Sequence, residues 1–236
     1  MKLSIIIPVR NEEHGVEKII NQLQNKLKSL SYEIIFINDF STDNTAKVTN
    51  EIIKNKNGIS LHDNEKKGLG GAINQGINKA TGDAICIMMS DLSDSIADLE
   101  KYYNIIKDEE VDAVFGSRFI KGSKIIDYPK KKLILNRIFN LITKLLFFSN
   151  YNDFTNAFKI YKKSALLKTL PLVSESFNIF LELPLKIISR KMNYKIIPIS
   201  WTNRKEGNSK FDIVELRGKY LFTLIYCLLE KLLLKK

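Results

Sequence analysis

The first half of the chain alternates short apolar runs with longer helical patterns, and this alternation limits the possible folds most. The apolar, β-branched runs lie at 3–7, 33–37, 58–62, 84–88 and 112–115. Between them, apolar residues recur with a helical period over 13–27, 42–54, 69–80 and 96–106. Strands that alternate with helices of this length form βαβ units around a mainly parallel sheet. We therefore predict an α/β fold of the doubly wound, Rossmann-like type, with helices on both faces.

The pattern changes after residue 118. A basic loop over 121–132 leads into an amphipathic run over 133–148. We then predict a strand at 157–161, helices at 163–169 and 177–190, a strand at 194–200 and a polar loop at 202–210. An apolar helix over 213–234 closes the chain. These patterns predict one domain over 1–212, with halves 1–117 and 118–212, and a C-terminal amphipathic segment over 213–236.

The net charge of +11 is concentrated in the second half of the chain. Residues 1–117 hold 13 Lys and Arg against 18 Asp and Glu, whereas residues 118–236 hold 24 against 8. A basic half indicates nucleic acid, an anionic membrane surface or a phosphorylated substrate. A surface that stacks nucleic-acid bases would interleave aromatic and basic residues. The aromatic residues here do not follow that pattern, so we predict no nucleic-acid partner.

The two apolar helices are too short or too interrupted to cross a bilayer, which takes about 20 predominantly apolar residues. Arg137 and Lys144 interrupt the run at 133–148, and Glu230 interrupts the last helix. Amphipathic helices of this kind lie in the headgroup plane. We favour contact with a membrane surface; packing in the core or in a homo-oligomer is the alternative.

The location of the protein follows from its first residues and its cysteines. The first predicted strand begins within three residues of the start, so we expect no signal peptide before it. Cys86 and Cys227 lie far apart inside apolar segments and have no metal-ligand spacing. We predict that both are core residues in a reducing compartment. Together with the amphipathic helices, this predicts a peripheral protein on the cytoplasmic face of a membrane.

Polar residues follow several predicted strands at the points where they end. Asp39 follows the second strand, a glycine-rich turn at Gly68 follows the third, and Asp91 follows the fourth. In open α/β sheets, ligands bind at the carboxyl ends of the strands. The alternatives are a structural tight turn at Gly68 and a helix N-cap at Ser93 or Asp94.

Several motifs resemble those of known enzymes. The segments SIIIPVRNEE, INDFSTDNT, KKGLGGAINQGINKATGD and MMSDLSDS resemble the nucleotide-sugar domain of family 2 glycosyltransferases. The segments GSRF and RKEGNSK resemble the dolichol-phosphate mannose synthase branch of that family. The resemblance extends over about residues 3–212. It implies a GT-A type fold in which 1–117 binds a nucleotide sugar and 118–212 binds the acceptor.

The resemblance also implies roles for individual residues. Arg118 would face the phosphates at the reaction centre, with Asp91 and Arg204 as further catalytic residues. Lys132 and Asn136 lie where the family places an arginine and a serine for the acceptor phosphate. The donor-side residues would be Pro8, Arg10, Glu12, Asp39, Gly68 and Ser90, together with Ser209 and Lys210 on a loop that closes over the diphosphate.

Two positions depart from the family pattern. Met89 replaces the first acid of the Asp-X-Asp metal motif, and a thioether is a poor ligand for hard divalent ions. Asp91 would therefore hold Mg²⁺ or Mn²⁺ alone, or with Ser93 or Asp94 and phosphate oxygens of the donor; weak or absent metal binding is the alternative. Lys132 replaces an arginine, which keeps the charge but loses the bidentate geometry.

Three functions fit these features. The first is an inverting transferase that moves a sugar from GDP-mannose or a UDP-sugar to a polyprenyl phosphate at the membrane surface. A lipid phosphate is already anionic, so it needs no strong general base. The second is transfer to a glycan hydroxyl, for which Asp153 is the best candidate base, although we favour a bracing role for this residue. The third is a catalytically weak nucleotide-binding or scaffolding protein.

Overall fold

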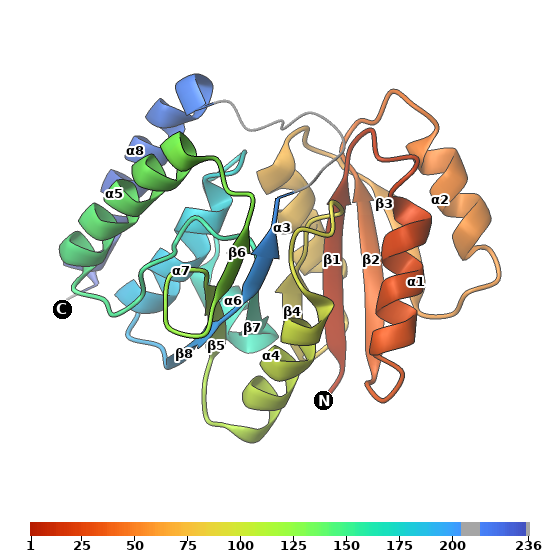
Figure 1. Cartoon of the computed structure of the whole chain (residues 1–236), viewed down its shortest axis with the longest axis horizontal. Coiled ribbons are helices and arrows are strands. Elements are labelled where there is room, and N and C mark those ends of the chain that lie inside the picture. The colour runs from red at the N-terminus through yellow and green to blue at the C-terminus, as the bar shows by residue number, and fades with distance from the viewer. Residues whose placement is uncertain (204–212, 235–236) are drawn as a thin grey trace.

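The structure, a computed structural model, describes residues 1–203 and 213–234 and contains a seven-stranded sheet of order β3-β2-β1-β4-β7-β5-β8 (Figure 1). All neighbouring strands are parallel except at β7, which is antiparallel to β4 and β5. A second, two-stranded sheet pairs β6 with β9. The strands are β1 (Leu3–Val9), β2 (Tyr32–Asn38), β3 (Ile59–Asp63), β4 (Ala84–Ile87), β5 (Ala113–Ser117), β6 (Lys124–Ile126), β7 (Lys159–Lys162), β8 (Tyr194–Pro198) and β9 (Ser200–Thr202).

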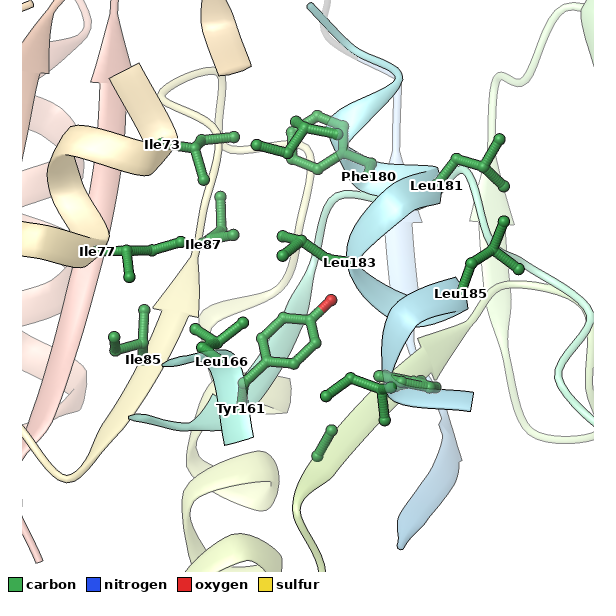
Figure 2. Close-up of a cluster of buried hydrophobic side chains, with 14 of the residues drawn as sticks. Ile73, Ile77, Ile85, Ile87, Tyr161, Leu166, Phe180, Leu181, Leu183 and Leu185 are labelled. Carbon is green, nitrogen blue, oxygen red and sulfur yellow. The ribbon is translucent and has the colours of Figure 1, made fainter. Parts of the chain in front are cut away.

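Helices cover both faces of the large sheet and enclose one apolar core on each side. One core joins the sheet to helices α1, α2 and α4. The other joins it to α3, α5, α6, α7 and α8, and Figure 2 shows part of this second core around Leu183 and Tyr161. The helices are α1 (Val16–Lys26), α2 (Thr45–Ile53), α3 (Leu69–Lys79), α4 (Ile96–Asp108), α5 (Lys130–Phe147), α6 (Lys163–Thr169), α7 (Ile179–Ser189) and α8 (Ile213–Leu233).

The sequence explains why the strands form the centre. In β1, Ile5 and Ile7 point into one core and Ile6 into the other, because successive side chains of a strand alternate between faces. Both faces are covered, so the strand carries apolar residues at consecutive positions. The predicted α/β fold with helices on both faces is therefore confirmed. Cys86 and Cys227 are buried and free, as expected of core residues.

Some elements differ from the prediction. The strand expected at 194–200 is divided into β8 and β9, and the loop expected at 121–132 contains β6 and the start of α5. Lys124 and Ile126 of β6 are exposed, so this strand has no apolar pattern and forms through its pairing with β9. No helix in the described ranges is long and apolar enough to cross a membrane.

Helices α5 and α8 lie side by side at the edge of the molecule (Figure 1). The rings of Phe139 and Tyr220 pack with centroids 5.7 Å apart, and Lys231 Nζ donates a hydrogen bond to the Phe147 carbonyl at 2.7 Å. Many large apolar side chains of the two helices are nevertheless exposed. We call this surface the α5–α8 apolar face; it consists of Ile134, Leu135, Ile138, Leu141, Ile142, Leu145, Leu221, Phe222, Ile225, Leu229, Leu232 and Leu233.

Polar contacts attach the inner side of α8 to α7. Glu230 forms ion pairs with Lys186 and Arg190. Nearby, Asn178 Nδ2 donates a hydrogen bond to the Thr223 hydroxyl at 2.9 Å. Lys186 also pairs with the buried Glu182 at 3.1 Å. These contacts fix α8 on the domain while its outer side remains apolar.

Candidate active site

The loops that follow β1 and β2 are joined by hydrogen bonds at the carboxyl edge of the sheet. The Asn11 amide donates to Ser41 Oγ at 3.1 Å, and the Thr42 amide donates to Asn11 Oδ1 at 2.8 Å. The Glu12 amide donates to Thr45 Oγ1 at 2.8 Å. Arg10 is exposed and Pro8 is buried at the end of β1. These contacts hold the expected nucleoside-side residues of both loops next to one another.

Asp39 connects the β2 loop to the glycine-rich turn. Its carboxylate Oδ1 accepts hydrogen bonds from the Gly68 amide at 2.7 Å and from Asn64 Nδ2 at 2.8 Å. The turn itself packs closely on another segment, because a Cβ added to Gly70 would lie 2.0 Å from the Ser174 carbonyl oxygen. Gly70 is therefore required for close packing of the turn, which is the structural explanation of this glycine. Asp39 and Gly68, both predicted on the donor side, are in direct contact.

The segment after β4 carries the acidic residues. Asp91 Oδ1 accepts a hydrogen bond from the Ser93 amide at 3.0 Å. Asp94 is buried, and its Oδ1 has no hydrogen-bond partner among the described residues. Burial, followed by the negative charge of Asp91, raises the pKa of Asp94 to about 7. Ser90 is buried, and its carbonyl oxygen would lie 3.8 Å from a Cβ on Gly15, so this segment adjoins the β1 loop.

Three residues of this edge adopt left-handed backbone conformations although they are not glycine. They are Asn11, Phe40 and Leu92, with φ values of 53°, 55° and 56°, one in each loop that follows β1, β2 and β4. Such conformations are costly for residues with a side chain, above all for bulky ones. Backbone strain of this kind concentrates at functional sites. Asp127, Phe148 and Lys191 share this conformation outside the three loops, so the strain accompanies the candidate site without defining it.

Arg118, at the end of β5, is held by a buried carboxylate. Its Nε and Nη2 donate hydrogen bonds to Asp153 Oδ2 at 2.8 Å and Oδ1 at 2.7 Å. Asp153 is fully buried, and both of its oxygens are used in this pair. Burial acts to lower the pKa of Arg118, but the Asp153 charge outweighs it and the net shift is upward. Asp153 therefore braces Arg118, whereas we had favoured a capping or bracing role toward the strand that follows its loop.

Aromatic rings surround the Arg118 guanidinium. Its central carbon lies 5.4, 5.5 and 5.7 Å from the ring centroids of Phe119, Tyr128 and Trp201. Trp201 belongs to β9, so the small sheet supplies part of this enclosure. Cation–π contacts and the ion pair together restrict the guanidinium to one orientation. Arg118 is thus a fixed positive charge near the carboxyl edge of the sheet.

Helix α5 adjoins the loop that carries Asp153. Asn136 Nδ2 donates hydrogen bonds to Thr155 Oγ1 at 2.9 Å and to the Tyr128 hydroxyl at 3.2 Å. One turn later, Asn140 Oδ1 accepts a hydrogen bond from the Phe154 amide at 2.6 Å. Lys132, the other expected acceptor-side residue, is half-buried in the first turn of α5. The polar side of α5 therefore holds the loop that orients Arg118.

Lys159 is a buried lysine to which the sequence pattern assigned no role. Its Nζ donates hydrogen bonds to the carbonyl oxygens of Phe154 at 3.1 Å, Phe180 at 3.3 Å and Asn156. Burial lowers its pKa to about 7, although the charge of Asp153 acts in the opposite direction. The available signal was a lysine inside the apolar run at 157–161. Lys159 anchors the same loop that α5 holds from the other side.

The structure brings most of the predicted residues to one edge of the sheet. Asp39, Asp91 and Arg118 follow or end β2, β4 and β5, whose carboxyl ends share this edge (Figure 1). The described residues contain no group of three His, Cys, Asp or Glu that could hold a metal ion. Arg204, Ser209 and Lys210 lie outside the described residues.

Comparison with known proteins defines the class. Residues 4–170 match the model of Glycosyl transferase family 2, so the chain belongs to this family. The "Dolichol-phosphate mannosyltransferase" of Pyrococcus furiosus is 26% identical over 224 residues, covering 94% of this chain and 61% of that protein. "Glycosyltransferase AglD" of Haloferax volcanii is 24% identical over 221 residues, covering 91% and 35%. The chain thus spans less than two thirds of the length of either relative.

Solved structures confirm the GT-A fold. Glucosyl-3-phosphoglycerate synthase from Mycobacterium tuberculosis in complex with UDP superposes with a TM-score of 0.74 at 15% identity, covering 96% of this chain and 80% of that chain. The same enzyme in complex with Mn²⁺, UDP-glucose and phosphoglyceric acid gives a TM-score of 0.75 at 15% identity, with 96% and 79% covered. At this identity the similarity establishes the fold alone.

Proposed function

We propose that the chain transfers a sugar from a nucleoside diphosphate sugar to a polyprenyl phosphate at a membrane surface. The observation that carries the proposal is that α5 has an exposed apolar side and a polar side that contacts the candidate site. Its outer side belongs to the α5–α8 apolar face, and its inner side holds the Asp153 loop through Asn136 and Asn140. An exposed apolar surface of this extent is typical of a membrane or protein contact. The similarity to a dolichol-phosphate mannosyltransferase supports the lipid phosphate.

The donor would bind at the loops after β1, β2 and β4. Pro8, Arg10, Glu12 and Asp39 would surround the nucleoside, with Gly68 and Ser90 beside them. Arg204, Ser209 and Lys210 would close over the diphosphate. The donor would be GDP-mannose or a UDP-sugar, and the solved neighbour with UDP-glucose supports a nucleotide sugar in general.

A divalent cation fits this site through few protein ligands. Mg²⁺ and Mn²⁺ prefer oxygen, and Mg²⁺ is commonly bound through one or two carboxylates together with substrate phosphates. Asp91 would supply the carboxylate, with Ser93 or the unpartnered Asp94 Oδ1 as further oxygen donors. When bound, the cation would neutralise charge on the leaving diphosphate. The solved neighbour that contains Mn²⁺ together with UDP-glucose supports a divalent cation in general, not these ligands.

In the proposed reaction, a phosphate oxygen of the acceptor attacks the anomeric carbon of the sugar. The bond from that carbon to the donor diphosphate breaks, and the nucleoside diphosphate leaves with the electron pair. Inversion follows from this single displacement. Arg118 would stabilise the phosphate charges, because a fixed cation in a shielded site needs little reorganisation during the reaction. Lys132 and Asn136 would position the acceptor phosphate.

The acceptor distinguishes this proposal from transfer to a glycan hydroxyl. A hydroxyl must lose its proton to a base. Asp153 is fully buried, and both of its oxygens accept hydrogen bonds from Arg118. This arrangement favours a phosphate acceptor, which needs no proton transfer. The apolar face and the basic second half would hold the enzyme peripherally on the cytoplasmic side of the membrane.

The test is an incubation with radiolabelled GDP-mannose or UDP-glucose and a polyprenyl phosphate in detergent. We expect a lipid-extractable labelled sugar, which Arg118→Ala abolishes. Lys107→Ala, an exposed change on α4 away from this edge, is the control and should retain activity. Failure of both donors to label the lipid, or full activity of Arg118→Ala, would overturn the proposal. Transfer to a glycan alone would favour the hydroxyl acceptor.

A further inference from the structure

Phe40 combines a strained backbone with an exposed ring. Its φ of 55° lies in the left-handed region, and its side chain is 47% exposed. For an L-residue this conformation costs roughly 1–2 kcal/mol relative to the right-handed one, whereas glycine adopts it freely. The ring also makes no ring–ring or cation–ring contact within the ranges that the structure describes. Packing therefore covers only part of this residue.

Anchored neighbours on both sides fix the position of Phe40. Before it, the Asp39 amide donates to the Val9 carbonyl at 2.8 Å, and the Asp39 carboxylate accepts from the Gly68 amide. After it, Ser41 Oγ accepts from the Asn11 amide, and the Ser41 amide donates to Asn38 Oδ1 at 3.2 Å. The strained φ is thus imposed by contacts of the β1, β2 and β3 loops.

We propose that Phe40 is the platform on which the base of the donor nucleotide stacks. This inference rests on the proposed function, which puts a nucleoside beside Asp39. Aromatic side chains bind nucleic-acid bases through their faces without strict base selectivity. The ring would therefore add affinity for the nucleoside, while hydrogen bonds from other residues would select the base. A platform of this kind explains why a half-exposed aromatic residue occupies a position that favours glycine.

The test compares Phe40→Gly with the parent by calorimetry in the presence of Mn²⁺. The probes are UDP, GDP and inorganic pyrophosphate, which lacks a base. We expect Phe40→Gly to weaken binding of the nucleoside diphosphate about ten-fold or more and to leave pyrophosphate binding unchanged. Phe40→Trp should restore nucleotide binding. Because glycine relieves the strain, the melting temperature of Phe40→Gly should also rise by about 2–4 °C.

Phe148→Gly is the matched control. Phe148 has nearly the same φ, 51°, and is 92% exposed, but it follows α5 rather than β2. Its replacement should leave nucleotide affinity unchanged. Equal nucleotide binding by Phe40→Gly and the parent, or equal weakening of pyrophosphate binding, would overturn the stacking role alone. A parent protein that binds none of the three probes would overturn the proposed function as well.

Discussion

Arg118 and Asp153 form a bidentate ion pair in which both side chains are buried. The exposed fractions of the side chains are 7% and 0%, and the closest N–O distance is 2.7 Å. The Arg118 amide also donates to Asp153 Oδ2 at 2.9 Å, so the pair fixes the backbone as well as the side chain. The direction of the guanidinium is therefore set by the loop that carries Asp153.

Replacement of this carboxylate should harm both stability and activity. Removal of one partner from a buried ion pair costs about 3–5 kcal/mol, because the other charge is left without compensation. We expect Asp153→Asn to lower the free energy of unfolding by about this amount in urea denaturation, and transfer should fall with it. Glu109→Gln breaks the exposed pair with Lys195 and should change stability by less than about 1 kcal/mol. Equal losses in both variants would contradict the burial argument.

The metal motif can be tested by restoring its missing acid. Met89→Asp places a carboxylate two residues before Asp91, and hard divalent ions prefer such oxygen ligands. We expect UDP to bind Met89→Asp more tightly than the parent in the presence of Mn²⁺, and equally in EDTA, by calorimetry. Met89→Leu keeps an apolar side chain and should behave as the parent. Tighter binding that persists in EDTA would argue against a metal site.

Lys159 should make stability depend on pH above neutrality. Its pKa in the folded protein is lowered to about 7 by burial, whereas an unfolded lysine titrates near the ordinary value of 10.5. Between these values the unfolded chain binds more protons, so the free energy of unfolding rises with pH. Relative to Lys159→Met, the parent should gain on the order of 3 kcal/mol from pH ~7 to pH ~9.5. Parallel pH curves for the two proteins in urea denaturation would refute this prediction.

The glycine turn offers a steric prediction. A Cβ at Gly70 would lie 2.0 Å from the Ser174 carbonyl oxygen, a backbone atom that cannot move alone. Gly70→Ala should therefore lower the free energy of unfolding by roughly 1–3 kcal/mol or more. Gly218→Ala, in α8, meets nothing within 4 Å and should raise it by roughly 0.5–1 kcal/mol through helix propensity. Thermal denaturation of both variants separates steric conflict from a general effect of alanine.

The α5–α8 apolar face should bind lipid. Leu145 in α5 is 63% exposed, and asparagine there removes apolar area that would enter the headgroup region. Leu145→Asn should reduce cosedimentation with anionic vesicles several-fold. Leu167→Asn, on α6, changes a leucine of comparable exposure (49%) outside this face and is the control. If both variants sediment as the parent does, the apolar face does not bind these membranes.

The main elements of the fold could be predicted because their apolar patterns are local. The runs that became β1, β2 and β4 are apolar at consecutive positions, since helices cover both faces of the sheet. The short strands β6 and β9 could not be predicted in the same way. They are half-exposed and exist through their mutual pairing, across more than seventy residues of sequence.

The positions of the candidate site residues could be predicted where a sequence motif contains them, but not where only packing brings them together. Asp39, Asp91 and Arg118 stand at strand ends and could be selected from the sequence. The partner of Arg118 could not be determined, because Asp153 lies 35 residues away and its role was open between base and brace. Lys159 was missed because the local sequence does not show that its ammonium group donates hydrogen bonds to distant backbone carbonyls.

The reversed direction of β7 determines which loops meet at the carboxyl rim of the sheet. Lys159, at the amino end of β7, is paired with Ile87 at the carboxyl end of β4. The segment before β7 therefore lies at the carboxyl rim of the sheet. The parallel strands place only the segments that follow them at this rim. That segment carries Asp153, so the carboxylate that holds Arg118 reaches this rim on a loop that precedes a strand. One antiparallel strand thus lets a loop that enters a strand lie at the same rim as the loops that leave β1, β2 and β4.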